Sequence, residues 1–198
     1  MTGHEARTGA CGETLALWCV LAPAAMAELG RDGRCLLKRR HIEEKHGECA
    51  WSFLEAYGWL ARRLEDSVAR PCGAELPYRL FADSHRVTPA PGSTALLLEV
   101  PASEALTFDL RAWERVEGLR YIGADGADER GFEGRLASQG VKTVASAFRT
   151  PFFPLVRREI VRSWDRLPAS AEGCPPEYLA AAVWQVRREW VVREEPCR

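Results

Sequence analysis

The sequence lacks the short motifs that identify many enzyme families at sight. It has no Gly-Lys-Ser/Thr, which a nucleoside triphosphate loop requires, and no Gly-x-Ser-x-Gly, which marks the nucleophile of α/β-hydrolases. Glycine pairs within residues 123–134 resemble a phosphate loop in spacing only, because the acidic Asp125, Asp128 and Glu129 would repel a phosphate. The pattern therefore gives no support to either of these chemistries.

An excess of charge of either sign is also missing. The formal net charge is -1, so no global field attracts nucleic acid or an anionic membrane. The longest apolar segment, residues 15–27, is interrupted by Pro23 and is too short to span a bilayer. Glu5 and Glu13 precede it, where a signal peptide needs positive charge. We therefore expect a cytoplasmic protein without membrane or nucleic-acid partners and leave its oligomeric state open.

The seven cysteines form no Cys-x-x-Cys pair, and their odd number and scattered positions do not suggest a disulfide framework. Cys35, His41, His46 and Cys49 fall within fifteen residues and are of types that bind zinc. Only His46 and Cys49 have a tight spacing, and on a helix His41 and His46 would diverge by about 140°. We assign no metal and keep a small zinc-binding protein as the least favoured alternative.

Apolar runs between breakers predict the strands. Residues 94–100 form an almost continuous apolar run that ends at Pro101, which indicates a strand covered on both faces. Residues 15–21 predict a second buried strand, residues 78–81 an edge strand, and residues 105–110 a short apolar segment before a helix that begins near Arg111. These strands locate the predicted core.

Helical spacing predicts the remaining core elements. The clearest helix covers residues 50–67, and a short one follows Pro23 and stops at Gly30. Further predictions are irregular chain at 31–46, a strand or helix at 141–148, a helix at 154–167, a helix at 177–188 and a closing strand at 190–192. This mixture predicts a single α+β domain at residues 15–194, with a small mixed or antiparallel sheet packed with helices, after a flexible tail at 1–14. Residues 118–140 are Gly-rich and charged, so we expect a surface excursion there.

The chain is rich in tryptophan, and most of these rings are expected in the core because they contribute large buried areas. The seven are Trp18, Trp51, Trp59, Trp113, Trp164, Trp184 and Trp190. Charged residues stand beside several of them or beside other apolar residues, namely Asp109, Arg166 and Glu189. Such a charge is either paired or faces a ligand, and Asp109 also suits the N-cap of the helix that follows it.

Five stretches, in this order, resemble a Trp-rich bacterial family of domains of unknown function, DUF3841. They are residues 17–21 (LWCVL), 53–60 (FLEAYGWL), 98–101 with 108–110 (LEVP, FDL), 163–166 (SWDR) and 183–186 with 189–192 (VWQV, EWVV). The resemblance implies no activity, because the family has none established. The family pattern has Thr-Ile-Gln where residues 19–21 read Cys-Val-Leu, and a strand rich in Trp, Tyr and Gln where residues 78–81 stand.

The opening order of strand, short helix, glycine and loop is similar in layout to ADP-ribosyltransferase-like folds, which cleave NAD. That similarity implies an arginine that contacts phosphates, a tryptophan that stacks on a base and a carboxylate that stabilises charge on the ribose. The residues that would serve are Glu189 as the catalytic group and, for ligand binding, Trp18, Arg79, Asp109, Arg166 and Trp184. The first hypothesis is thus a nucleotide- or NAD-binding domain, whose enzymatic form would be a transferase that acts on NAD. The alternative is a non-enzymatic interaction or accessory module.

Overall fold

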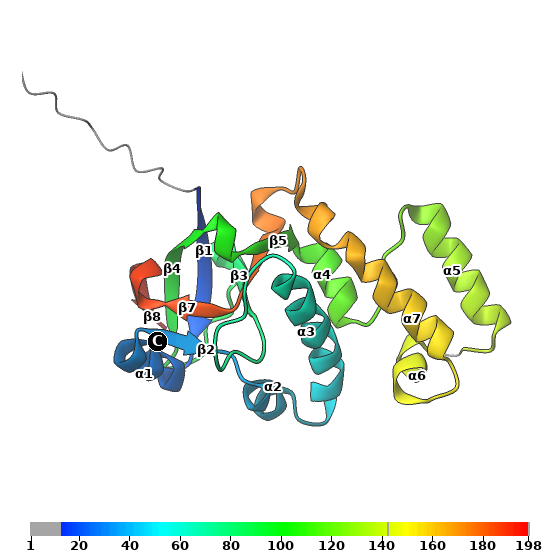
Figure 1. The fold of residues 1–198 in the computed structure, drawn as a ribbon, viewed down its shortest axis with the longest axis horizontal. Helices are drawn as coiled ribbons and strands as arrows, with labels where there is room; N and C mark the ends of the chain where they lie inside the picture. The colour runs from blue at the N-terminus through cyan, green and yellow to red at the C-terminus, as the bar shows by residue number, and fades with distance from the viewer. Residues whose placement is uncertain (1–12, 142, 198) are drawn as a thin grey trace, which may run out of the picture.

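A computed structural model describes residues 13–141 and 143–197 of the chain (Figure 1). Its strands are β1 (Thr14–Leu21), β2 (Arg34–Leu36), β3 (Tyr78–Phe81), β4 (Thr94–Pro101), β5 (Leu106–Asp109), β6 (Leu179–Val183), β7 (Gln185–Arg187) and β8 (Val191–Pro196). Its α-helices are α1 (Pro23–Asp32), α2 (Arg39–His46), α3 (Ala50–Glu65), α4 (Leu110–Glu117), α5 (Gly126–Ser138), α6 (Val144–Arg149) and α7 (Pro154–Ser163).

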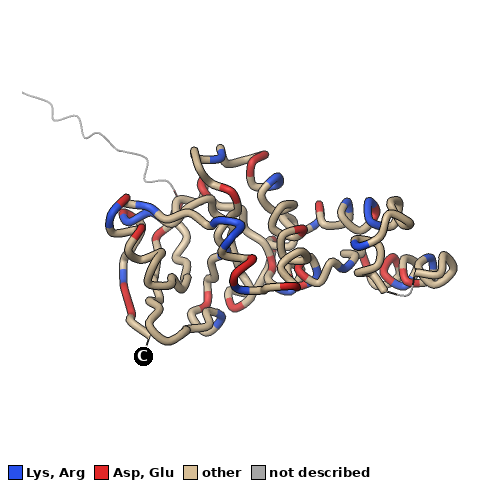
Figure 2. Tube along the Cα trace, turned by 90° about the horizontal axis from the view of Figure 1, so that it is seen from below, with Lys and Arg blue, Asp and Glu red and all other residues tan. Residues whose placement is uncertain are grey.

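Six strands form one antiparallel sheet in the order β5-β6-β3-β1-β4-β8, and β2 pairs with β7 in a separate two-stranded ribbon. The molecule is elongated, with the sheet and α1 at one end, α5 to α7 at the other, and α3 and α4 between them (Figure 1). Positively and negatively charged residues are interspersed along the trace at both ends of the molecule (Figure 2). The predicted single α+β domain with an antiparallel sheet is confirmed.

The sheet separates two apolar clusters. On one side, Leu96 and Leu98 of β4 pack with Leu29 of α1 and Val186 of the ribbon. On the other side, Phe108 and its neighbours pack against α3 and α4, and this cluster continues to α7 through buried Trp164. Five of the seven tryptophans are at most 5% exposed, as expected for core rings. They are Trp59, Trp113, Trp164, Trp184 and Trp190.

Strand β4 lies inside the sheet as predicted, paired with β1 over eight residues from Leu21–Thr94 to Thr14–Pro101. Leu96, Leu98 and Val100 are fully buried, whereas Leu97 is half-buried and Glu99 is exposed. The expectation that both faces of this strand are covered is therefore wrong. Helices α3 and α4 pack over the β5-β6-β3 half of the sheet, and the second face of β1 and β4 stays partly open.

Strand β3 is internal, not at the edge as predicted, because β6 from the C-terminal part of the chain pairs with it on the side opposite β1. The helix predicted at 177–188 is also wrong, since this segment forms β6 and β7. Residues 180–183 are fully buried in both side-chain directions. A strand covered on both faces has no alternation, so its apolar residues satisfy helical spacing by accident.

Regular structure extends into residues for which the sequence predicts a helix end and an irregular segment. Helix α1 continues through Gly30 to Asp32 and ends at Gly33, whose positive φ of 69° favours glycine. Residues 31–46, expected to be irregular, hold β2 and α2. Helix α3 begins at the predicted residue, and α7 covers most of the helix predicted at 154–167.

The predicted surface excursion at 118–140 is helical from Gly126 to Ser138. Asp125 caps α5 by accepting hydrogen bonds from the backbone N–H groups of Ala127 and Asp128. Buried Phe132 stacks on Tyr121 with ring centroids 4.2 Å apart, which attaches the helix to the core. Of the two alternatives predicted for residues 141–148, a strand or a helix, the structure has the helix, α6. Only residues 13 and 14 of the predicted tail lie within the described chain.

None of the helices in the described ranges has both the length and the apolar character that crossing a bilayer requires.

The burial difference within β4 gives a stability test. Replacing fully buried Leu98 by Ala leaves a cavity and is expected to lower the free energy of unfolding by about 2–5 kcal/mol. Leu97→Ala, on the partly open face of the same strand, is the matched control and should cost less than about 1.5 kcal/mol. Urea unfolding followed by circular dichroism measures both, and equal losses would contradict the assignment of faces.

Candidate functional site

Arg79 of β3 lies on the sheet face that α3 and α4 cover. Its Nη1 donates a hydrogen bond to Glu117 Oε1 at the end of α4 over 2.8 Å, and the two side chains are 23% and 20% exposed. The guanidinium lies 5.8 Å from the ring centre of Trp113. Tyr57 of α3 meets the same indole edge-on at 5.4 Å. We call Tyr57, Arg79, Trp113 and Glu117 the Arg79 site.

Two hydrogen-bond donors in this site have no partner among the described residues. They are Arg79 Nε and Trp113 Nε1, and both atoms are buried. A buried donor without an acceptor is costly, so unpaired buried groups often mark functional positions. The site thus offers two adjacent side chains that donate and one carboxylate that accepts.

The ionisation of Tyr57 and Arg79 follows from their mutual position. Burial raises the pKa of the Tyr57 phenol, which Arg79 lowers to a smaller extent, so the hydroxyl stays protonated at neutral pH. Burial lowers the pKa of Arg79, but the negative charge and the hydrogen bond of Glu117 favour the charged guanidinium, and the pKa rises overall. The site therefore holds a charged guanidinium beside a neutral phenol.

Trp18 shares this face of the sheet with Arg79. It is paired across β1 and β3 with Phe81, and the Arg79 guanidinium lies 5.3 Å from the Phe81 ring. Diagonal neighbours on adjacent strands are about 7–8 Å apart, within reach of long side chains. The Trp18 ring is half-buried, and the Arg193 guanidinium lies 4.8 Å from its centre. The structure thus brings together two of the six residues selected from the sequence.

Asp109 is the N-cap of α4, as expected from its position. Its Oδ1 accepts a hydrogen bond from the Arg111 N–H over 2.8 Å, and the Arg111 guanidinium pairs with the same carboxylate over 2.5 Å. Burial raises the pKa of Asp109, but the hydrogen bonds and charge of Arg111 outweigh it and lower the pKa overall. These contacts give Asp109 a structural role.

Arg166 and Trp184 are held by protein groups. Arg166 donates to the carbonyl oxygen of Ile122 over 2.7 Å and lies 3.8 Å from Asp128, so it ties the segment before α5 to the end of α7. Trp184 is 2% exposed, and its Nε1 donates to the Val68 carbonyl over 2.8 Å. A ring this deeply buried has no surface on which a base could stack.

Glu189 lies just after β7, at the sheet end of the molecule, with 69% of its side chain exposed. It is 3.3 Å from Arg187 and borders a shallow polar pocket of about 200 Å³ that also involves Arg34 and Gln185. Within residues 13–141 and 143–197, no hydrogen bond or ion pair connects Glu189 with Asp109 or Arg166. These three charged residues therefore do not form one site through direct contacts.

The four residues considered for zinc are separated. Cys35 is buried in β2, where burial raises the pKa of its thiol to about 11, whereas Cys49 is exposed before α3. His46 stacks on Phe53 with ring centroids 3.7 Å apart. The described residues contain no group of three or more His, Cys, Asp or Glu side chains placed to hold a metal ion.

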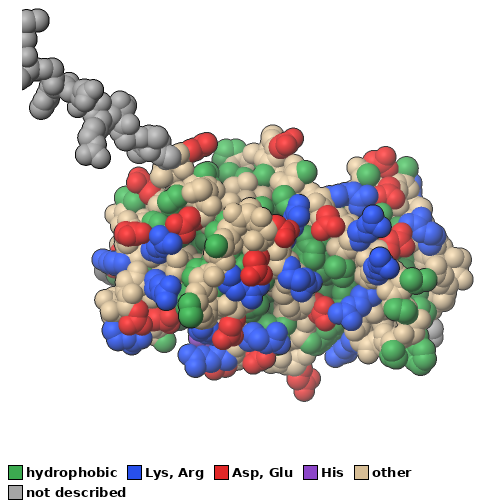
Figure 3. Space-filling model, viewed as in Figure 1, with side chains coloured by type: hydrophobic (Ala, Val, Ile, Leu, Met, Phe, Trp, Pro, Cys, Tyr) green, Lys and Arg blue, Asp and Glu red, His purple; other side chains and the backbone are tan. Residues whose placement is uncertain are grey.

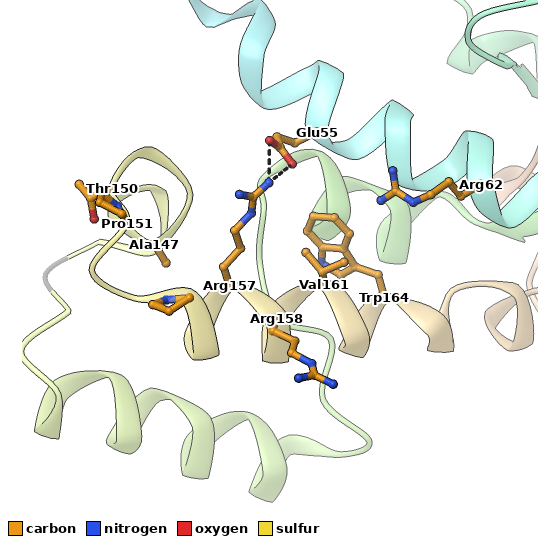
Figure 4. A pocket seen from close by; sticks show the side chains of 10 residues that line it. Glu55, Arg62, Ala147, Thr150, Pro151, Arg157, Arg158, Val161 and Trp164 are labelled. Atoms are coloured by element: carbon orange, nitrogen blue, oxygen red, sulfur yellow. Dashed lines mark hydrogen bonds and ion pairs between the residues drawn. The ribbon is translucent and has the colours of Figure 1, made fainter.

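A larger cavity, of about 400 Å³, lies between α3 and the α6–α7 unit. Arg157 of α7 reaches Glu55 of α3, Arg62 projects from α3 on the same side, and Arg158 points away at the outer rim (Figure 4). Val161 supplies part of the apolar lining. We call this cavity the arginine groove. None of these residues is identifiable from the sequence, because exposed arginines on helices are common and only the fold brings α3 and α7 together.

A family model described as Domain of unknown function (DUF3841) matches residues 16–192. Neither the curated proteins nor the solved structures contain a match to the chain.

The environment of Asp109 predicts a pH-dependent stability effect. Because its folded pKa is lowered, its contribution is present above the usual carboxyl pKa of about 3.9 and is lost as the pH falls through the folded pKa. Asp109→Asn keeps a capping side chain but loses the charged pair with Arg111, so it should lower the free energy of unfolding by up to about 1 kcal/mol at pH 7. The difference from wild type should shrink towards pH 3. Exposed Asp165→Asn is the control, and denaturant titrations at several pH values measure both. A pH-independent difference would contradict this interpretation.

Proposed function

We propose a function from the Arg79 site, because the chain belongs to the DUF3841 family and the description of that family gives no activity. The proposal is that the protein binds a nucleotide-class ligand at this site, with NAD as the first candidate. The observation that carries the proposal is the pair of buried, unpartnered donors from Arg79 and Trp113. Oxygen atoms of a phosphate or of a nicotinamide amide are the acceptors that such donors require.

Arg79 suits the phosphate end of the ligand. A planar guanidinium can keep one N–H on Glu117 while another side of its fork meets an oxygen of the ligand. The partial exposure of Arg79 and Glu117 indicates that this ion pair is reached from the surface, although the neighbouring Trp113 ring is fully buried.

Trp18 suits the base of the same ligand. It lies on the same sheet face as Arg79, and its ring is half-buried, so a base could stack on it in place of Arg193. Stacking of a base on an aromatic side chain contributes about 1–3 kcal/mol. The diagonal spacing of Trp18 and Arg79 is within the length of a nucleotide.

A transferase that cleaves NAD is the finer form of this proposal. Such a reaction needs a carboxylate near the ribose to stabilise the positive charge that develops there. Glu117 is the carboxylate in contact with Arg79, whereas Glu189 lies beyond the end of the ribbon strand β7. We therefore propose Glu117 for this role, and Glu189 would serve only if the ligand extended to the pocket at β7.

A non-enzymatic interaction module is the second candidate function. It is favoured by two exposed large apolar side chains, Phe152 and Leu155, which a surface without a partner would rarely place so close together.

The nucleotide proposal predicts ligand-dependent stabilisation. NAD, ADP-ribose and AMP should each raise the melting temperature, since a ligand at one hundred times its Kd stabilises the folded state by about 2.7 kcal/mol. Arg79→Lys keeps the charge but loses the planar fork, and it should weaken binding by about tenfold or more in calorimetric titration. Arg166→Lys is the matched control and should bind as wild type does.

Two results would count against this proposal. One is the absence of any thermal shift at millimolar ligand, and the other is equal binding by wild type and Arg79→Lys. Release of nicotinamide from NAD, followed by chromatography, tests the transferase step separately. Glu117→Gln should abolish the release while Glu189→Gln retains it, and the reverse result would return the catalytic role to Glu189.

A further inference from the structure

Phe152 and Leu155 are the two most exposed large apolar side chains of the described residues, at 79% and 76%. Phe152 lies in the turn before α7 and Leu155 in the first turn of that helix, at the end of the molecule opposite the sheet. The space-filling view shows hydrophobic side chains at this end (Figure 3). Single exposed apolar residues are ordinary on protein surfaces, but two within four residues, in a segment that also lines a cavity, favour an interaction site.

These two residues belong to the same chain segment as part of the wall of the arginine groove, although their own side chains do not line it. Their chain neighbours Pro151 and Pro154 line the groove together with Thr150 and Val161. The prolines fix the backbone at the rim, so the apolar pair is presented by a stiff segment. The segment that carries Phe152 and Leu155 therefore forms a rim next to the groove, and we call it the Phe152–Leu155 rim.

The charge of this surface is positive. Arg62, Arg157 and Arg158 line the groove against a single carboxylate, Glu55. Glu55 accepts two contacts of 2.9 Å from Arg157, and no carboxylate in the described part of the chain pairs with Arg62 or Arg158. Arg149 adds a further guanidinium at this end, 4.9 Å from the Trp51 ring.

From this geometry we propose that the arginine groove and its Phe152–Leu155 rim dock an acidic, amphipathic segment of a partner protein. Carboxylates of the partner would pair with Arg62 and Arg158 and share Arg157 with Glu55, while its apolar side chains would cover Phe152 and Leu155. Arginine and aromatic side chains are enriched at such interfaces. A second copy of this chain is a poorer occupant for the same face, because the unpaired guanidiniums of the two copies would repel each other.

This inference deepens the second candidate function and is independent of the nucleotide site, which lies on the sheet. Its test is a selection with the purified full chain from a random peptide library displayed on phage, followed by sequencing of the bound clones. We expect the enriched peptides to combine Asp or Glu with Leu, Phe or other large apolar residues.

Two variants establish where those peptides bind. The double variant Phe152→Ser with Leu155→Ser and the variant Arg62→Gln should each weaken the enriched peptides by about tenfold or more. Exposed residues remote from the groove, Val192→Ser and Arg130→Gln, are the matched controls and should leave binding unchanged. Since the altered side chains are exposed, all variants should keep the wild-type circular dichroism spectrum.

Several outcomes would overturn the proposal. Enriched peptides without acidic residues, or equal binding by all variants, would remove the proposed partner chemistry while leaving an interaction function in place. Absence of any enriched peptide would count against both the proposed partner chemistry and the interaction function. Sedimentation that shows a concentration-dependent dimer lost in Phe152→Ser with Leu155→Ser would make a second copy the occupant. Binding to vesicles of anionic lipid that depends on the same residues would make an anionic membrane the occupant of this surface.

Discussion

The eight-residue pairing of β1 with β4 is the constraint on which the rest of the structure depends. It joins residues 14–21 to residues 94–101 and places Leu17, Cys19, Leu96 and Leu98 on one fully buried face. Burial of this face against α1 and the β2–β7 ribbon removes a large apolar area from water, which is the main stabilising term for a domain of this size. Everything that lies on the opposite face, including Arg79 and Trp18, takes its position from that pairing.

The two candidate surfaces use different physical properties of the chain. The Arg79 site is small, partly buried and defined by donors that protein groups do not satisfy. The arginine groove is open, and its guanidiniums are mostly in contact with solvent. The first suits a ligand that gains from removal from water, whereas the second suits a flexible charged partner whose association is driven by attraction between opposite charges and by apolar contact at the rim.

The sequence predicted those elements whose pattern has one structural meaning. Thr94–Pro101, the helix from Ala50 and the N-cap at Asp109 are correct because breakers, helical spacing and capping chemistry are local. At the C-terminal strand β6 the apolar spacing wrongly predicts a helix, since a strand buried on both faces loses the alternation that identifies strands. The residues of the two candidate surfaces are harder to predict from the sequence than the strands and helices. Trp18 and Arg79 are separated by sixty-one positions in the chain and share one face of the sheet only because β1 and β3 pair. Likewise, Arg62 and Arg157 line one cavity only because two helices distant in the chain pack together.

The position of β6 and β8 also determines when the sheet can close. Strand β6 fills the place between β5 and β3, and β8 covers the outer side of β4, although both are made of residues 179–196. A nascent chain that has emerged only as far as α7 therefore has open edges at β3 and β4 and leaves β5 without a partner. Long-range pairing of this kind folds slowly and leaves strand edges open to wrong partners until synthesis has passed β8. The sheet of this domain can thus close only after residues 179–196 have been synthesised, so the N-terminal strands form their full set of pairs late.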